Sequence, residues 1–284
     1  MARILIAGCG YVGSALGARL VADSHEVWGL RRRPAALPEG VHFLGADLAV
    51  AASLRELPGE LDQIVYAAGP GGRDDAHYRT AYVEGLTRLL EALEQQSQRP
   101  ARVLFVSSTS VYAQTGGAWV DEESETKPSA HNGRRLLEAE SILHAAPWPG
   151  TVVRFGGIYG PRRTRLLERV RTGQAVYRSG TPRYTNRIHR DDCAGVLHHL
   201  LDHPAPDPLY LAVDDDPAEE REVMRWLADA LRAPGPRPAM DPPARSRGGA
   251  GNKRCRNARL RESGYTFAYP SYREGYAQLV RELS

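Results

Sequence analysis

The chain has few cysteines and no long hydrophobic run. Its three cysteines, Cys9, Cys193 and Cys255, are widely spaced and odd in number. We therefore expect neither a disulfide framework nor a cysteine-rich metal knuckle, and we predict a reducing, cytoplasmic location. No apolar stretch approaches the roughly 20 residues that span a bilayer, which excludes a membrane helix. The apolar run at residues 4–7 is too short for a signal-peptide core, and a buried strand explains it better.

Lysine is almost absent, and the charge is nearly balanced. Lys127 and Lys253 are the only lysines among 37 basic residues, and the net charge of +3 is too small to indicate a nucleic-acid partner. The arginines could bind phosphate groups, but an arginine-rich composition explains most of them. With 42% hydrophobic and 25% charged residues among 284, the composition is that of an ordinary globular protein.

Apolar runs alternate with helical patterns through the first two thirds of the chain. We predict strands at residues 4–7, 26–30, 41–44, 64–68, 103–106 and 151–155. Helices are expected after the first strand and at residues 78–96 and 132–144. This alternation predicts an α/β fold, a Rossmann-type doubly wound parallel sheet with helices on both faces.

The pattern loosens after Pro161. We predict helices at residues 162–172, 191–202, 219–231 and 272–283, and a strand at 209–213. Residues 233–251 are rich in proline, glycine and arginine, which is typical of a mobile loop. We therefore expect a Rossmann domain over residues 1–160, to which residues 185–215 return, and a small substrate-binding lobe formed by residues 161–184 and 216–284.

A glycine-rich segment follows the first predicted strand. Residues 8–13, Gly-Cys-Gly-Tyr-Val-Gly, fit the G-x-G-x-x-G pattern between a strand and a helix. Gly8 permits the tight turn, Gly10 lets a pyrophosphate approach the backbone, and Gly13 lets the helix pack closely on the strand. The helix N-terminus offers free N–H groups to the phosphates. The alternative is a glycine-rich turn without a ligand.

The end of the second predicted strand bears on cofactor choice. About 20 residues past the glycines, an acidic residue would bind the adenosine ribose of NAD. Here Arg31 holds that position and Arg32 follows. A cation favours a 2′-phosphate, so we predict NADP(H) over NAD(H), with a solvated basic turn as the competing interpretation. Asp47, after the third strand, could bind adenine or cap a helix.

Further segments follow the glycine loop in a recognisable order. They are residues 83–91, Ser-Ser-Thr-Ser-Val-Tyr at 107–112, Arg-Phe at 154–155, Ile-Tyr-Gly-Pro at 158–161 and Ile-His-Arg-Asp-Asp at 188–192. Together they resemble the extended short-chain dehydrogenase/reductase superfamily, in its NAD-dependent epimerase/dehydratase group, over essentially the whole chain. The segment at 107–112 and the helix pattern at 133–140 are most similar to the atypical bacterial YeeZ-like proteins.

The resemblance implies a set of cofactor contacts. They are Gly8, Gly10, Tyr11, Val12, Gly13, Arg31, Arg32, Asp47, Leu48, Ala67, Ala68, Gly69, Arg134, Phe155 and Ile158. It also implies a homodimer through residues 78–96 and 132–144.

The usual catalytic pair of that family is missing. Its members use Tyr-x-x-x-Lys, in which tyrosine is the general acid/base and lysine lowers its pKa and holds the nicotinamide ribose. An alignment that matches Glu140 puts Asn132 at the tyrosine position and Leu136 at the lysine position. A shifted alignment puts Ala130 and Arg134 there. No Tyr-x-x-x-Lys occurs anywhere in the sequence.

Other side chains could take part in the chemistry. Ser108 matches the family's substrate-orienting hydroxyl, and we predict it as catalytic, although a turn hydroxyl is the alternative. Thr109, Asn132 and Arg187 are the further substrate candidates. His131 has the right intrinsic pKa for acid/base work, but its position at a helix start favours an exposed residue. We expect no metal.

The sequence thus predicts an NAD(P)-dependent oxidoreductase or epimerase-like enzyme that acts on a small molecule of unknown identity. Bound nicotinamide brings its own hydride chemistry, whereas lost acid/base assistance is worth ~10² to 10⁴ in rate. The alternative is a non-catalytic protein that senses NADP(H) or a metabolite.

Overall fold

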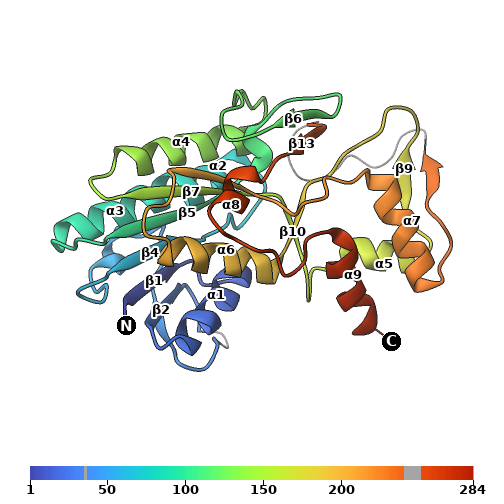
Figure 1. Ribbon diagram of the computed structural model, residues 1–284. Helices are drawn as coiled ribbons and strands as arrows, with labels where there is room; N and C mark the ends of the chain where they lie inside the picture. Colours follow the sequence, from blue (N-terminus) through green and yellow to red (C-terminus); the bar gives the residue numbers. More distant parts are fainter. Residues whose placement is uncertain (35–36, 240–250, 284) are drawn as a thin grey trace.

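A seven-stranded parallel sheet forms the centre of the molecule (Figure 1). The computed structural model describes residues 1–34, 37–239 and 251–283. The strands are β1 (Arg3–Ala7), β2 (Glu26–Arg31), β3 (Val41–Gly45), β4 (Gln63–Tyr66), β5 (Arg102–Ser108), β7 (Gly150–Phe155) and β11 (Leu209–Ala212), in the spatial order β11-β7-β5-β4-β1-β2-β3. The predicted Rossmann-type α/β fold is confirmed.

Helices cover both faces of this sheet. They are α1 (Tyr11–Ala22) and α6 (Arg190–Asp202) on one face, and α3 (Gly85–Gln95) and α4 (His131–Ala145) on the other. Successive residues of β1 serve opposite faces, as the strand period of two requires. Ile4 and Ile6 pack in the apolar cluster of α1 and α6, whereas Leu5 belongs to the cluster of α3 and α4. This two-sided burial explains why the strand is continuously apolar.

The chain reverses its direction across the sheet between β1 and β4. It first runs outward through β2 and β3, and then returns to build β4, β5, β7 and β11 on the other side of β1. In open α/β sheets, ligands bind outside the carboxyl ends of the strands at such a switch point. The glycine-rich segment follows β1 and therefore lies at this point.

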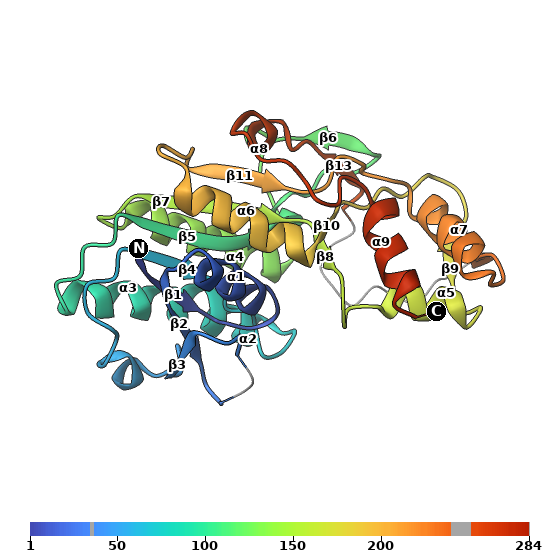
Figure 2. The ribbon, with the colours of Figure 1, turned by 60° about the horizontal axis from the view of Figure 1, so that its bottom comes forward.

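Helices α5 (Arg165–Arg171), α7 (Glu220–Leu231) and α9 (Tyr272–Arg281) lie beyond the carboxyl ends of the sheet strands (Figure 2). Their side chains contribute to a third apolar cluster. Two short parallel strands, β9 (Val176–Arg178) and β12 (Arg237–Ala239), pair beside these helices. None of the described helices is long and apolar enough to cross a membrane.

Several short elements differ from the predicted ones. The helix predicted at residues 78–96 begins earlier, at α2 (Asp75–Tyr78), and passes through a π-helical segment, η2 (Arg79–Glu84), before α3. Part of the segment predicted as a mobile loop, residues 233–251, forms β12, so the prediction is wrong there. Residues 240–250 lie outside the described residues.

Three short strand pairs and three short helices of the described residues were not predicted. They are β6 (Ala118–Val120) with β13 (Lys253–Cys255), β8 (Gly157–Tyr159) with β10 (Arg187–His189), β9 with β12, η1 (Ala51–Leu54), η3 (Thr109–Val111) and α8 (Ala258–Glu262).

A buried ion pair joins α4 to the sheet. Arg154 of β7 donates from Nε and from a terminal nitrogen to the two carboxylate oxygens of Glu140, at 3.0 and 2.6 Å. Ser107 Oγ donates to the same carboxylate at 2.6 Å, and the remaining Arg154 nitrogen donates to Tyr112 Oη at 2.7 Å. Glu140 and Arg154 are 4% and 5% exposed. Removing one partner therefore leaves the other charge buried without a counter-ion.

We expect Glu140→Leu to lower the free energy of unfolding by about 3–5 kcal/mol, because Arg154 is left unpaired in the core. The double variant Glu140→Leu/Arg154→Leu should lose less than the single variant. The matched control is Glu168→Ala, which breaks an exposed pair with Arg171 and should cost under about 1 kcal/mol. Urea unfolding followed by circular dichroism measures all three, and equal losses for Glu140→Leu and Glu168→Ala would contradict the assignment.

Candidate dinucleotide and substrate site

The glycine loop packs directly against the loop after β4. Gly8 has φ of +89°, and a Cβ at this position would overlap the backbone of Ala68. The backbone N–H groups of Gly8 and Cys9 donate to Leu30 O at 3.2 and 3.1 Å. The ends of β1, β2 and β4 are therefore held together at the switch point, and the close approach requires glycine.

Open space remains above the next glycines. A Cβ on Gly10 would meet only Gly8 O, at 3.8 Å, and a Cβ on Gly69 would meet nothing within 4 Å. Gly13, by contrast, lies against the Ile6 side chain, which would be 2.9 Å from an added Cβ. The N–H groups in the first turn of α1 have no acceptors within the helix. Free donors beside an open glycine backbone fit the pyrophosphate of a dinucleotide.

Arg31 lies beside this loop. It is the last residue of β2, pairs with Gly45 of β3, and is half-buried. Arg32 is exposed. Burial raises the pKa of the Cys9 thiol, and the hydrogen bond to Ser14 and the charge of Arg31 oppose that rise. Because Ala7 of β1 pairs with Leu30 of β2, Arg31 ends β2 at the same end of the sheet as the glycine loop that follows β1.

Other residues predicted to contact the cofactor form hydrogen bonds or apolar contacts within the protein. Asp47 Oδ1 accepts a hydrogen bond from Ala49 N at 2.9 Å, so this carboxylate organises the turn after β3. Leu48 packs against the apolar cluster of α3 and α4, and Ala67 against that of α1 and α6. Tyr11 donates from its hydroxyl to Pro161 O at 2.7 Å. The glycine loop is thereby tied to the segment that leads away from the sheet.

Ser108 and Phe155 end adjacent strands and are register partners. Ser108 Oγ accepts from Ser110 N at 3.2 Å and so stabilises the short turn after β5, η3 (Thr109–Val111). A hydroxyl that accepts in this way still has its own hydrogen to donate. Thr109 is 8% exposed and Phe155 1%. Ile158 of β8 packs against the apolar cluster of α1 and α6.

The positions aligned with the usual catalytic pair hold very different side chains. Asn132, the second residue of α4, is 8% exposed, and its amide forms no hydrogen bond within the described part of the chain. Leu136 is 2% exposed and belongs to the apolar cluster of α3 and α4. In the shifted alignment, Ala130 precedes α4, and Arg134 is exposed and donates to Ser129 O at 2.5 Å. Neither alignment places an ionisable proton donor beside Ser108.

His131, the remaining candidate on α4, and the nearby Arg135 both contact residues of the segment around α2. His131 Nε2 lies 3.0 Å from Arg73 O, and its ring packs edge-on against Tyr78. Arg135 forms two hydrogen bonds of 2.8 Å to the carboxylate of Asp75 on α2. Both side chains hold α4 against the segment that begins at α2.

Residues of the Ile-His-Arg-Asp-Asp segment connect the sheet to the C-terminal segment. Asp192 accepts from Tyr265 Oη, Ala268 N and Tyr269 N at 2.8–2.9 Å. Arg187, predicted to contact substrate, is 7% exposed and lies against Tyr276.

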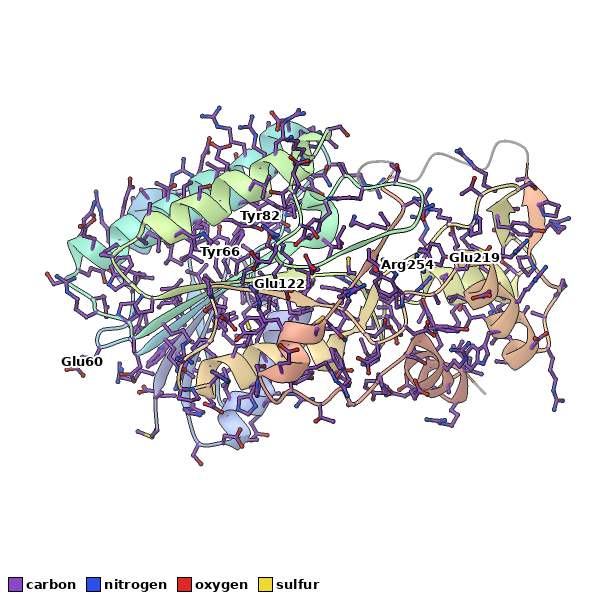
Figure 3. All side chains as sticks on the ribbon, turned by 45° about the horizontal axis from the view of Figure 1, so that its top comes forward. Glu60, Tyr66, Tyr82, Glu122, Glu219 and Arg254 are labelled. Atoms are coloured by element: carbon purple, nitrogen blue, oxygen red, sulfur yellow. The ribbon has the colours of Figure 1, made fainter. Side chains whose placement is uncertain are left out.

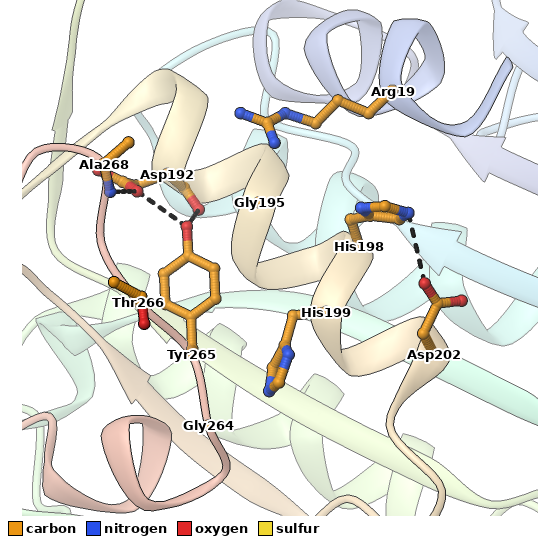
Figure 4. A pocket seen from close by; sticks show the side chains of 10 residues that line it. All are labelled: Arg19, Asp192, Gly195, His198, His199, Asp202, Gly264, Tyr265, Thr266 and Ala268. Carbon is orange, nitrogen blue, oxygen red and sulfur yellow. Dashed lines mark hydrogen bonds and ion pairs between the residues drawn. The ribbon is translucent and has the colours of Figure 1, made fainter. Parts of the chain in front are cut away.

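A separate surface hollow of about 410 Å³ lies against the last turn of α1 and the outer side of α6 (Figure 4). Arg19, His198, His199 and Tyr265 contribute to its lining, and His198 Nε2 lies 2.8 Å from the Asp23 carboxylate. The glycine loop adjoins the opposite end of α1, so this hollow is not part of the predicted site. No group of three or more His, Cys, Asp or Glu side chains among the described residues could hold a metal ion.

Comparison with known proteins gives a consistent result. The model of the NAD-dependent epimerase/dehydratase family matches residues 4–211. The 3-diazoavenalumate denitrifying reductase of a Streptomyces species is 28% identical, over 96% of this chain and 98% of that protein. Protein YeeZ of Escherichia coli K12 is 27% identical, over 74% of this chain and 77% of its own length.

Among solved structures, a putative NAD-dependent epimerase/dehydratase from Methylobacillus flagellatus has a TM-score of 0.82 and 38% identity. The alignment covers 99% of this chain and 98% of that one.

Substitutions at Gly8 and at Gly10 should differ in their effect on the free energy of unfolding. Gly10→Ala adds a methyl group to open space, so we expect the free energy of unfolding to change by less than about 1 kcal/mol while NADPH binding is lost. Gly8→Ala places a side chain at positive φ against Ala68 and should destabilise the fold by about 1–3 kcal/mol. Urea unfolding and NADPH titration by tryptophan fluorescence measure both effects. Wild-type NADPH affinity in Gly10→Ala would contradict this placement of the pyrophosphate.

Proposed function

This chain belongs to the NAD-dependent epimerase/dehydratase family, and on that basis we propose that it is an NADPH-dependent reductase of a small molecule. The open glycine backbone at Gly10 is the observation that carries the proposal, and Arg31 ends β2 at the same end of the sheet. In this assignment Gly10 and the N-terminus of α1 hold the pyrophosphate, and Arg31 holds the 2′-phosphate. When bound, NADPH supplies a hydride from its nicotinamide ring.

The substrate would lie at the carboxyl ends of β5 and β7, between these strands and the apolar cluster of α5, α7 and α9. Ser108 and Asn132 can each donate a hydrogen bond there and so orient a polar group. Neither side chain ionises near neutral pH, and Leu136 offers no cation. Their chemistry favours an acceptor that takes up hydride without receiving a proton from the protein.

One class of acceptor meets this condition in full. When hydride adds to the ring carbon of an aryl diazonium ion, a C–H bond forms, the C–N bond breaks, and N₂ leaves with the bonding electron pair. No alkoxide develops, so no Tyr–Lys pair is required. The Streptomyces relative is named as a denitrifying reductase of a diazo compound, which supports the same class of acceptor here.

A second candidate function is a sensor that binds NADP(H) without turnover. Leu136 favours this candidate, because a buried leucine replaces the residue that would hold the nicotinamide ribose in other family members. The two functions differ in whether hydride ever leaves the cofactor.

Hydride transfer is tested with NADPH deuterated at C4, prepared as each epimer, and a panel of aldehydes, ketones and aryl diazonium salts. We expect one epimer to transfer deuterium to the diazonium carbon, as detected by mass spectrometry. The Gly10→Ala variant controls for direct reduction in solution and should give only that background. Tight NADPH binding with no deuterated product from any acceptor would favour the sensor.

Cofactor preference is tested at Arg31. Arg31→Glu should lower the ratio of NADPH to NADH affinity at least tenfold, because a charge-assisted hydrogen bond of about 1.5–3 kcal/mol is replaced by repulsion. Arg33→Glu is the matched control, since Arg33 is exposed and lies beyond the strand end. Quenching of the tryptophan fluorescence, to which Trp28 on β2 contributes, reports both affinities. An unchanged ratio in Arg31→Glu would remove this residue from the 2′-phosphate site.

A further inference from the structure

The ribbon formed by β6 and β13 brings the C-terminal part of the chain to the segment after β5. In the parallel register Ala118 pairs with Lys253 and Trp119 with Arg254. Arg254 stacks over Trp119 with its guanidinium carbon 4.7 Å from the ring centre. The ribbon lies between the sheet and α7, where Figure 3 labels Arg254. Its two neighbours on β13, Lys253 and Cys255, are buried.

Lys253 is a buried cation with few partners. Its side chain is 9% exposed, and Nζ donates one hydrogen bond, to Tyr112 O at 3.1 Å. It forms no ion pair with a carboxylate of the described residues, whereas Lys127 pairs with Glu125 at the surface. Burial lowers the pKa of the Lys253 ammonium group. An ammonium group has three donors, and a buried charge without a counter-ion is costly.

The ammonium group lies close to the backbone of a glycine. A Cβ on Gly251 would lie 3.3 Å from Lys253 Nζ and 3.5 Å from Tyr112 O. A side chain at residue 251 would therefore crowd the ammonium group, and Tyr112 is separated from Ser108 only by the short turn η3.

The ribbon is fixed to the end of β7 by Asn186. Its amide donates to Lys253 O at 3.1 Å and accepts from Cys255 N at 2.7 Å. The backbone carbonyl oxygen of Asn186 accepts a hydrogen bond from Gly157 N at 2.8 Å. Lys253 is thus held at the same end of the sheet as Ser108 and Phe155, although it is far from both in sequence.

We propose that Lys253 is a substrate-binding residue that pairs with a carboxylate of the substrate, next to the turn after Ser108. This inference rests on the proposed reductase function and adds the substrate class, a carboxylate-bearing molecule. A carboxylate at this point supplies the counter-ion that the described residues do not, and it accepts the two hydrogen bonds that Nζ does not give to Tyr112.

The two lysines of the chain allow a direct test. Protein labelled with ¹³C at lysine Cε gives two lysine signals, and Lys253→Met assigns them by removing one. With NADPH saturating, we expect benzoate to shift the Lys253 signal and to leave Lys127 unmoved, whereas neutral benzamide shifts neither. Lys253→Met should bind NADPH like the wild type and weaken benzoate binding at least tenfold, while Lys127→Met is the matched control with wild-type behaviour.

Acetate and inorganic phosphate are titrated in the same way. If benzoate, acetate and phosphate all leave the Lys253 signal unmoved, this lysine only stabilises the Tyr112 carbonyl and the inference is overturned. Unchanged benzoate affinity in Lys253→Met would also overturn it. NADPH saturation is read separately from Trp28 fluorescence. Failure to bind NADPH would count against the proposed function, whereas failure of the anion titration alone counts against the role of Lys253.

Discussion

The buried ion pair between Glu140 and Arg154 fixes how α4 packs against the ends of β5 and β7. Arg154 of β7 holds α4 through Glu140 and holds the turn after β5 through Tyr112 Oη. Tyr112 in turn donates to Asp121 O at 2.8 Å, just after β6. One connected set of hydrogen bonds therefore fixes Asn132 on α4, the turn at Ser108 and the ribbon that carries Lys253. Because both charges are desolvated, small displacements of one element are resisted by all of them.

Helix α4 packs on the sheet, but it carries no Tyr-x-x-x-Lys sequence. Leu136 fills the core at the position where a catalytic lysine would align, and Asn132 offers only a neutral amide. Cofactor binding and acid/base chemistry are physically separable, because the glycine loop lies at β1 and β4 whereas α4 packs over β5 and β7. A substitution on α4 therefore leaves the packing of the glycine loop against the ends of β1 and β4 unchanged.

Much of this arrangement is predictable from the sequence. Continuous apolar strands and the glycine pattern at residues 8–13 identify the sheet and the switch point, because both depend on local sequence. The ribbon of β6 and β13 could not be predicted, since three-residue strands carry no periodic pattern and these two are more than a hundred residues apart. The partners of Glu140 and Lys253 were missed because each lies on a different element, and the sequence carries no signal for which side chains of two elements meet. One signal was available, namely that Lys253 is a lysine in a chain that otherwise uses arginine almost throughout.

A crystal structure of the protein with NADPH tests most directly whether the carboxyl end of this sheet is a reductase site. We expect the pyrophosphate over Gly10, the 2′-phosphate within hydrogen-bonding distance of Arg31, and the nicotinamide ring beside Ser108 and Asn132. A dinucleotide bound away from the glycine loop, or a nicotinamide ring remote from Ser108, would contradict this assignment.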